Sequence, residues 1–425
     1  MVYADLLLFT PPAKKSIIIF KAIKNRLHNF SCKLFRVYCA KGGRESKVKN
    51  LSFLIKPASS LCNMRCKYCF YANIAENREV ASMGIMPPET TEALVKSAFE
   101  ALSPRGQINF AFQGGEPTLA GIEYFRGFVK LVRKHAPAGV AVHFSLQTNG
   151  LTLDEDWASF LHENGFLVGV SVDGDKALHD THRVDSAQKG TFNRVVKNLG
   201  LLQKHNVDVN LLCVVSGQCA RRPQRVYSAL KKLGVRHLQF IPCLDPIDEK
   251  RGSKPYSLTP REYANFLCIL FNEWYRDWEQ GRYVGIRLFE DYVQLAMGLP
   301  PSTCATSGSC GSYLVVEGDG SLYPCDFYVL DEWRLGNINE ISPLAALESP
   351  LSKRFLDEGS IKPDSCAACR WVQLCNGGCK RDHCSDGSLK NYYCSAFSLF
   401  FERSAERIAH VARLELQHRQ RAGRP

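Results

Sequence analysis

Three cysteines stand within eight residues near the start of the chain, in the pattern Cys62-x3-Cys66-x2-Cys69. Thiolates hold iron–sulfur clusters, and a cubane cluster offers four irons. Three thiolates can therefore hold three irons and leave the fourth open, which is what distinguishes a catalytic metal site from a closed structural one. A zinc site is the other interpretation, but zinc needs a fourth ligand close by, and residues 70–107 contain no Cys or His.

A second group of cysteines lies in the last third of the chain, where nine of the 18 fall between Cys304 and Cys394. Core cysteines acting as small hydrophobes would be scattered, so this clustering favours metal binding. Eight of the nine make two complete sets of four, which could hold two clusters or two zinc ions, because spacing alone does not choose the metal. These eight are Cys304, Cys310, Cys325, Cys366, Cys369, Cys375, Cys379 and Cys394.

An alternation of strand and helix patterns positions these motifs. Apolar or β-branched runs predict strands at 51–56, 108–113, 140–147, 167–173, 207–215 and 237–241. Apolar residues spaced near 3.6 predict helices between them, at 89–102, 121–135, 154–164, 191–205 and 221–233. Strands that alternate with helices imply a parallel sheet with right-handed crossovers. Six units are too few for a closed eightfold barrel, so we expect an α/β fold, a partial (β/α)6 barrel.

Polar and glycine-rich turns follow several of these strands. Gly114-Gly115-Glu116-Pro117 follows the second, Asn149-Gly150 the third and Asp173-Gly174 the fourth. Each is a common turn former and is weak evidence alone. Every one lies at the carboxyl end of a strand, however, and that is the face where (β/α) barrels build active sites.

The remaining segments divide the chain into five predicted parts. Residues 1–48 form a basic extension, expected to be disordered, and 49–255 form the barrel. A helical connector (256–303) leads into the cysteine-rich domain (304–395), which holds a hairpin turned by Gly318-Asp319-Gly320. A final helix at 397–418 lies in the last part, 396–425.

Composition and charge exclude several classes of protein. Apolar content of 45% and charged content of 23% are typical of a globular protein, and no apolar run approaches the roughly 20 residues that span a bilayer. We find no export signal at the N-terminus and expect a cytoplasmic protein. Residues 1–50 carry eleven Lys or Arg against two acids, which is +9 of the net +12. The charge belongs to a tail, so neither nucleic acid nor a membrane is an expected partner.

The cysteine run with Tyr68 before its last member resembles the radical S-adenosylmethionine (SAM) superfamily. In that family the open iron binds SAM, and one electron cleaves it to methionine and a 5′-deoxyadenosyl radical. The Gly-Gly-Glu-Pro run resembles the motif that holds the SAM amino group. Carried over by position, the resemblance implies SAM contacts from Tyr68, Gly115, Glu116, Ser171, Arg183 and Leu244. Arg183 could instead be a surface charge.

The later cysteines resemble the SPASM domain of peptide-modifying radical SAM enzymes, which carries two auxiliary 4Fe–4S clusters. By order, the resemblance implies one cluster held by Cys304, Cys310, Cys325 and Cys379. It implies a second held by Cys366, Cys369, Cys375 and Cys394. Cys384 lies between the last two ligands and could exchange roles with Cys394.

Within that group, residues 50–405 are most similar to the anaerobic sulfatase-maturating enzymes. The motifs that carry this similarity include Gln113 to Thr118, Gln239 to Leu244 and Tyr323 to Tyr328. Such enzymes oxidise a Cys or Ser of a sulfatase to Cα-formylglycine, with a low-potential donor such as ferredoxin or flavodoxin. The similarity implies that Asp326 is the base, with Tyr71 and Gln113 as substrate or SAM contacts. Asp326 could instead only cap a turn.

Two other functions remain open from the sequence. One is a SPASM enzyme that forms thioether or carbon–carbon crosslinks in a precursor peptide. The other is a non-catalytic zinc or iron–sulfur scaffold, which would leave the open iron and the Gly-Gly-Glu-Pro turn unexplained.

Metal analysis separates the scaffold from the enzymes. Three cubane clusters predict about twelve irons per chain in anaerobically purified protein, with matching sulfide. Zinc in place of iron and sulfide would contradict the prediction.

Overall fold

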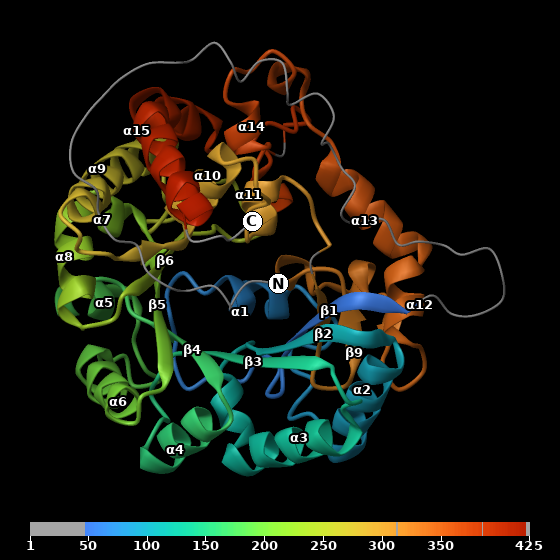
Figure 1. Ribbon diagram of the computed structural model, residues 1–425. Helices are drawn as coiled ribbons and strands as arrows, with labels where there is room; N and C mark the ends of the chain where they lie inside the picture. Colours follow the sequence, from blue (N-terminus) through green and yellow to red (C-terminus); the bar gives the residue numbers. More distant parts are fainter. Residues whose placement is uncertain (1–46, 312, 385, 422–425) are drawn as a thin grey trace.

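A single ten-stranded sheet organises the protein, in a computed structural model that describes residues 47–311, 313–384 and 386–421. The strand order is β10-β9-β8-β1-β2-β3-β4-β5-β6-β7. Strands β1 to β6 are parallel to one another and follow one another in sequence. Figure 1 shows the helices covering the outer face of this curved sheet, so the predicted partial (β/α)6 barrel is confirmed.

The six predicted barrel strands are all present. They are β1 (Val48–Ile55), β2 (Leu102–Phe112), β3 (Ala141–Thr148), β4 (Phe166–Ser171), β5 (Asp208–Val215) and β6 (His237–Pro242). Their ends differ from prediction chiefly in β2, which begins six residues early because Leu102 pairs with Val48 at the start of β1. Residues 1–46 of the predicted extension lie outside the described residues, and Val48 itself belongs to the sheet.

The outer helices bury one apolar face each against the sheet. They are α2 (Pro88–Glu100), α3 (Ile122–His135), α4 (Glu155–Glu163), α6 (Phe192–Lys204) and α8 (Pro223–Lys232). In α3 the buried residues Phe125, Phe128, Val129 and Val132 follow the spacing of one helix face. Gly165 and Gly234 follow α4 and α8 with φ of 63° and 76°, and so end these helices in the left-handed conformation that glycine favours.

Three short helices of the barrel were not among the predicted elements: α1 (Phe70–Glu76), α5 (Lys176–His182) and α7 (Gly217–Ala220). Each is a loop segment of seven residues or fewer, too short to show a helical period in the sequence. Side chains cap all three, including Cys69 at α1 and Asp175 at α5.

The predicted connector holds two helices, α9 (Pro260–Glu279) and α10 (Arg287–Ala296), and the short strand β7 (Gly285–Ile286) that pairs with β6. A capping box between Thr259 and Glu262 starts α9. Helix α15 (Cys394–Arg421) packs along α9 and α10, and it is longer at both ends than the predicted 397–418.

The cysteine-rich region continues the barrel sheet. Strand β8 (Leu314–Val316) pairs in parallel with β1, and β9 (Ser321–Tyr323) returns antiparallel to β8, which confirms the predicted hairpin. Strand β10 (Gly336–Asn337) pairs antiparallel with β9 and is the last strand at this end of the sheet. Strand β1 pairs with β2 of the barrel and with β8 of the cysteine-rich region, so one sheet runs through both. The domain boundaries at 256 and 304 stay predictions.

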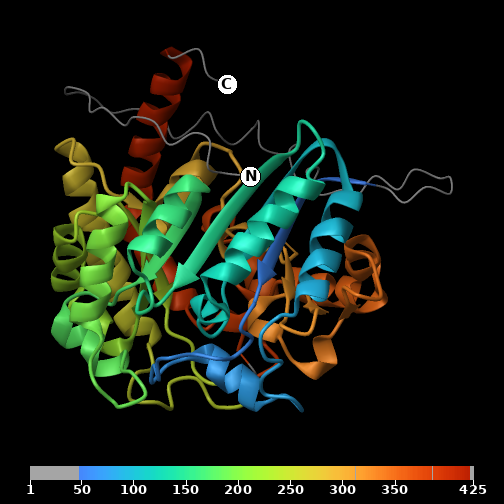
Figure 2. The same ribbon diagram turned by 90° about the horizontal axis from the view of Figure 1, so that it is seen from below.

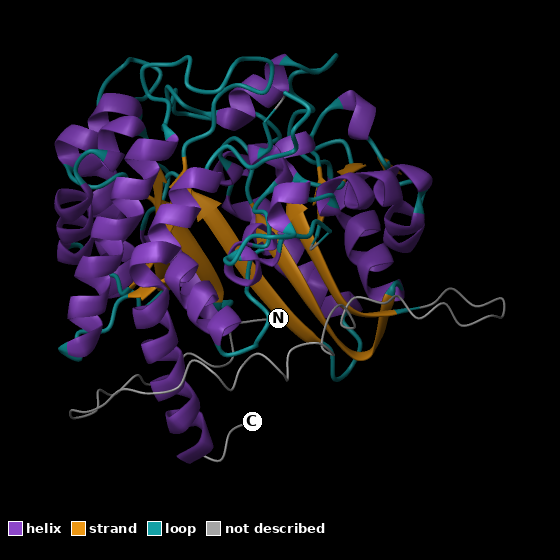
Figure 3. Cartoon of the chain, turned by 90° about the horizontal axis from the view of Figure 1, so that it is seen from above, coloured by secondary structure: helices purple, strands orange, loops and turns teal. Residues whose placement is uncertain are grey.

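The cysteine-rich region also holds four helices: α11 (Cys304–Ser307), α12 (Pro343–Glu348), α13 (Pro350–Ser360) and α14 (Val372–Cys375). Figure 3 shows the loops gathered beyond the arrowheads of the strands, and Figure 2 shows β1 leading into the segment that carries the first cysteines. In the described part of the chain, no helix combines the length and apolar character needed to cross a bilayer.

Candidate active site

The first cysteine loop and the Gly-Gly-Glu-Pro turn are packed together at the carboxyl edge of the sheet. The amide of Gly115 donates to the carbonyl of Ser59 at 2.9 Å, and the amide of Glu116 donates to the carbonyl of Leu61 at 2.7 Å. A Cβ on Gly115 would lie 2.1 Å from the oxygen of Leu61. Glycine is therefore required here by the approach of another loop, whether or not a ligand also contacts it.

The carboxylate of Glu116 is buried and bonded within the protein. It accepts hydrogen bonds from Thr118 N at 3.1 Å, Thr148 Oγ1 at 2.8 Å and Asn149 N at 2.7 Å. Burial raises the pKa of this carboxyl, and these donors oppose the rise. Glu116 thus ties the turns after β2 and β3 together, and its predicted contact with the SAM amino group stays a prediction.

Two of the predicted SAM contacts share a buried acid, Asp173, which follows β4. Arg183 donates to it from Nε at 2.9 Å and from Nη2 at 3.2 Å, and the Tyr68 hydroxyl also donates to it. Burial opposes the charge of Asp173, but Arg183 and the hydrogen bonds lower its pKa overall. Arg183 is 7% exposed, so it is not the surface charge that the sequence left open.

Ser171 and Leu244 stand at the same edge, where β4 ends and two residues after β6 ends. Both are buried. The structure therefore brings Tyr68, Ser171, Arg183 and Leu244 to the carboxyl side of the sheet. Their contacts with SAM stay predictions.

The three cysteines of the first run follow β1 and influence one another electrostatically. Amide groups point at two of the sulfurs: Met64 N lies 3.4 Å from Cys62 Sγ, and Ala72 N lies 3.4 Å from Cys69 Sγ. Burial raises the pKa of Cys62 to about 11 and that of Cys66 to about 12. Free thiols would therefore stay protonated at neutral pH, whereas coordination to iron stabilises the thiolate.

The electrostatic interactions of the later cysteines agree with the two predicted sets, whose roles as cluster ligands stay predictions. Burial is the main cause that raises the pKa of these thiols; Cys304 adds to the rise at Cys310, Cys325 and Cys379, and Cys394 adds to it at Cys366 and Cys375. Burial raises the pKa of the Cys384 thiol, and Cys394 contributes to that rise. Which of these two cysteines completes the second set stays a prediction.

No group of three or more Cys, His, Asp or Glu in the described residues is arranged to hold one metal ion. Zinc ligands must converge on a single point, whereas each thiolate of a cubane binds a different iron. What fits iron–sulfur clusters is the donor chemistry of the three groups, which consist entirely of cysteine thiols.

Asp326 directly follows Cys325 and is held in a buried ion pair. Its Oδ1 lies 2.5 Å from Nζ of Lys56, at the end of β1, and its Oδ2 accepts a hydrogen bond from Gln113 Nε2 at 3.0 Å. Lys56 is fully buried and lies 3.6 Å above the ring of Tyr71. Asp326 therefore does more than cap a turn, because its side chain joins the ends of β1 and β2 to the cysteine-rich half.

Tyr71, predicted as a substrate or SAM contact, is 2% exposed, and its hydroxyl donates to Glu317. Arg78 pairs with the same carboxylate at 2.8 Å. Contact of Tyr71 with a substrate stays a prediction, and the structure shows it packing against Lys56. Sequence reasoning missed Lys56 and the partnership of Glu317 with Arg78.

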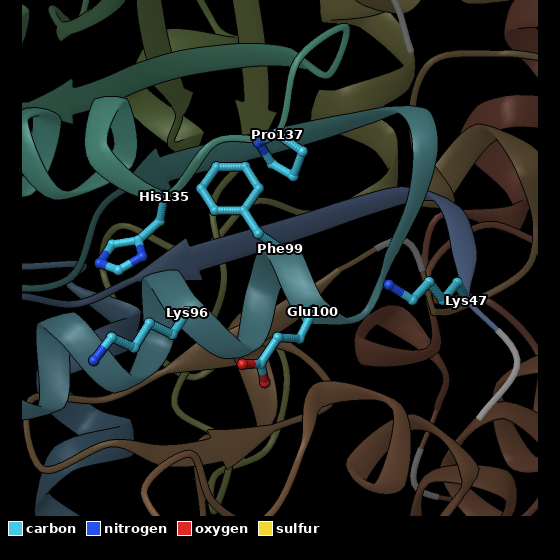
Figure 4. Close-up of a pocket in the computed structure, with 6 residues that line it drawn as sticks. All are labelled: Lys47, Lys96, Phe99, Glu100, His135 and Pro137. Atoms are coloured by element: carbon cyan, nitrogen blue, oxygen red, sulfur yellow. The ribbon is translucent and has the colours of Figure 1, made fainter. Parts of the chain in front are cut away.

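A pocket elsewhere in the protein is lined by Lys47, Lys96, Phe99, Glu100, His135 and Pro137 (Figure 4). These residues lie at the ends of α2 and α3 and just before β1, where the strands begin. The pocket is thus at the opposite edge of the sheet from the cysteines and Asp326. It contains none of the predicted site residues.

Two family models match the chain: the radical SAM superfamily over residues 57–239 and an iron–sulfur cluster-binding domain, SPASM, over residues 308–370. A cysteine-type anaerobic sulfatase-maturating enzyme of Clostridium novyi is 44% identical over 369 residues, which cover 86% of this chain and 98% of that protein. The chain belongs to the anaerobic sulfatase-maturating enzymes. The family's fold, radical SAM chemistry and cluster-binding domain are those that the sequence predicted.

A further relative and a solved structure are also similar to this chain. A serine-type anaerobic sulfatase-maturating enzyme of Klebsiella aerogenes is 33% identical over 350 residues, or 82% of this chain and 84% of that protein. The solved structure of anSMEcpe with bound AdoMet and Kp18Cys peptide matches with a TM-score of 0.82 at 44% identity. That match covers 86% of this chain and 99% of the solved one.

The Lys56–Asp326 pair predicts a double-mutant result. Lys56→Met should lower the stability of the protein by about 3–5 kcal/mol, because it leaves a buried carboxylate unpaired. Adding Asp326→Asn should recover part of that loss, since the uncompensated charge is gone. Unfolding midpoints of all four proteins provide the measurement, and purely additive losses would contradict the pairing.

The cysteine sets predict different losses of iron. Cys394→Ala should bind about one third less iron than the unaltered protein, because one of three clusters is lost. Cys384→Ala, the matched control, should keep its full iron content. The reverse result would exchange the roles of the two cysteines.

Proposed function

We propose that this enzyme oxidises a cysteine side chain in the active-site segment of a sulfatase to Cα-formylglycine. The observation that carries the proposal is the place of Asp326. It is a buried carboxylate beside a candidate cluster ligand, and Gln113 and Lys56 hold it at the edge of the sheet where the first cysteine run also emerges.

The proposed chemistry assigns distinct tasks to the residues of this edge. When bound, SAM and a cluster with one open iron supply the radical that removes a hydrogen from Cβ of the target. Asp326 accepts the thiol proton, because a thiol is too weak an acid to ionise unaided at neutral pH. Lys56 holds one oxygen of that carboxylate and Gln113 the other, so its position is defined before substrate arrives.

The cofactor assignments are part of the proposal. Cys62, Cys66 and Cys69 would hold the SAM-binding 4Fe–4S cluster, and the two later sets would each hold an auxiliary cluster. Tyr68, Ser171, Arg183 and Leu244 would surround SAM. The shared carboxylate of Asp173 supports this, because it fixes the Tyr68 hydroxyl and the Arg183 guanidinium in one arrangement.

Similarity to characterised enzymes supports cysteine over serine as the target. The cysteine-type relative from Clostridium novyi is 44% identical, against 33% for the serine-type relative from Klebsiella aerogenes, over similar shares of this chain. No observation favours a maturase that crosslinks a precursor peptide.

Two partners follow from the chemistry. One is a sulfatase polypeptide, presented as an extended segment that reaches Asp326. The other is a low-potential one-electron donor such as ferredoxin or flavodoxin, which the first electron transfer requires.

Replacing Asp326 tests the proposed base. Asp326→Ala should still cleave SAM to 5′-deoxyadenosine but form the aldehyde about 10²- to 10⁴-fold more slowly, the usual contribution of a general base. Mass spectrometry of a sulfatase peptide containing the target cysteine, incubated with enzyme, SAM and reductant, measures both products.

Asp331→Ala is the matched control, because this carboxylate follows Asp326 closely in the sequence but accepts its side-chain hydrogen bond from the amide of Glu79, at 2.9 Å, and not from Lys56 or Gln113. It should keep the normal aldehyde yield. An unchanged yield in Asp326→Ala would remove Asp326 from the mechanism.

A further inference from the structure

The hairpin of β8 and β9 places a tyrosine opposite a candidate cluster ligand. Val315 pairs with Tyr323 across the two antiparallel strands. Tyr313 precedes Val315 by two residues, and Cys325 follows Tyr323 by two. The same register, continued just beyond the two strands, therefore puts Tyr313 opposite Cys325. The Tyr313 hydroxyl oxygen lies 3.8 Å from Cys325 Sγ, within hydrogen-bonding distance for sulfur.

The direction of this hydrogen bond follows from its surroundings. The amide of Asp326 donates to the Tyr313 oxygen at 3.4 Å, so the hydroxyl already acts as an acceptor there and its own proton remains to be donated. A thiolate bound to iron carries no proton and can only accept. A tyrosine hydroxyl ordinarily keeps its proton at neutral pH, so it is available as the donor.

We propose that Tyr313 donates a hydrogen bond to the cluster-bound thiolate of Cys325 and thereby raises the reduction potential of that auxiliary cluster. The inference rests on the proposed function, since it takes Cys325 as a cluster ligand. A reduced cluster carries one more negative charge than an oxidised one. A donor at its sulfur therefore stabilises the reduced form more, and hydrogen bonds to the sulfurs are one determinant of cluster potential.

A higher reduction potential makes the auxiliary cluster a better electron acceptor, which the step proposed beside Asp326 requires. After hydrogen abstraction the target is a radical, R–CH•–SH. It forms the thioaldehyde R–CH=S by losing one proton to Asp326 and one electron to the cluster at Cys325. Tyr313 contacts the amide of Asp326, the proposed proton acceptor, and the sulfur of Cys325, the proposed ligand of the cluster that takes the electron. It therefore acts as a positioning and tuning residue.

Tyr313→Phe removes the hydroxyl and keeps the ring. In a redox titration of the holoenzyme followed by electron paramagnetic resonance, one auxiliary cluster should shift to a lower midpoint potential. The SAM-binding cluster, identified by its spectral response to added SAM, should not shift. A midpoint potential equal to that of the unaltered enzyme would overturn the proposal.

Tyr323→Phe is the matched control. It makes the same chemical change in the same hairpin, and the Tyr323 hydroxyl is buried with no hydrogen-bond partner among the described residues. Tyr323 faces Val315 across the hairpin, not a cysteine. All three midpoint potentials should stay unchanged in this variant, and a shift equal to that of Tyr313→Phe would also overturn the proposal.

A second substitution gives a result of opposite sign without removing the side chain. 3-Fluorotyrosine incorporated at position 313 is a stronger donor of nearly the same shape, so the same cluster should shift to a higher potential. An unchanged or lower potential would contradict the inference. Turnover of a sulfatase peptide is scored separately, because the shift in potential does not depend on the identity of the substrate.

Discussion

The buried ion pair between Lys56 and Asp326 is the interaction on which the rest of the site depends. It joins residues 270 positions apart in the sequence. Lys56 is 0% exposed, so its ammonium group has no water to stabilise it and must be compensated by the protein. Strand β1 makes this possible because it pairs with β2 on one side and β8 on the other. The barrel and the cysteine-rich half thus meet along one strand.

This ion pair, with the hydrogen bond from Gln113, brings candidate site residues from three segments of the chain together. The first cysteine run leaves the end of β1, the Gly-Gly-Glu-Pro turn leaves the end of β2, and Cys325 with Asp326 follows β9. The proposed proton acceptor and the proposed ligand of the electron-accepting cluster are then neighbours in sequence, and the proposed ligands of the SAM-binding cluster follow a barrel strand. Breaking the ion pair would remove an interaction that fixes the position of Asp326. It would also remove one contact between the barrel and the cysteine-rich half.

Much of this could be predicted from sequence, because the signals are local. Strand periodicity located β1 to β6, and the spacing of Cys62, Cys66 and Cys69 identified the cluster motif within eight residues. Lys56 gave no such signal: it ends an apolar strand like many surface lysines, and its partner is distant in the chain. Tertiary packing alone shows that it is buried.

The polar residues after the strands show the same limit. Glu116 was predicted from its motif, but its four hydrogen bonds come from Thr118, Thr148 and Asn149, whose convergence requires the parallel sheet. The role of Asp173 as shared partner of Tyr68 and Arg183 likewise depends on two segments far apart in the sequence, one after β1 and one after β4. Motifs therefore identified the residues, and folding decided what each one contacts.

Isotope transfer tests the central claim most directly. That claim is that the side chain of the target cysteine lies between the site where the radical forms and Asp326. A sulfatase peptide whose target cysteine carries two deuterons on Cβ is incubated with the enzyme, SAM and a one-electron reductant. The account predicts 5′-deoxyadenosine one mass unit heavier, formed together with the aldehyde. Unlabelled 5′-deoxyadenosine formed alongside the aldehyde would contradict it.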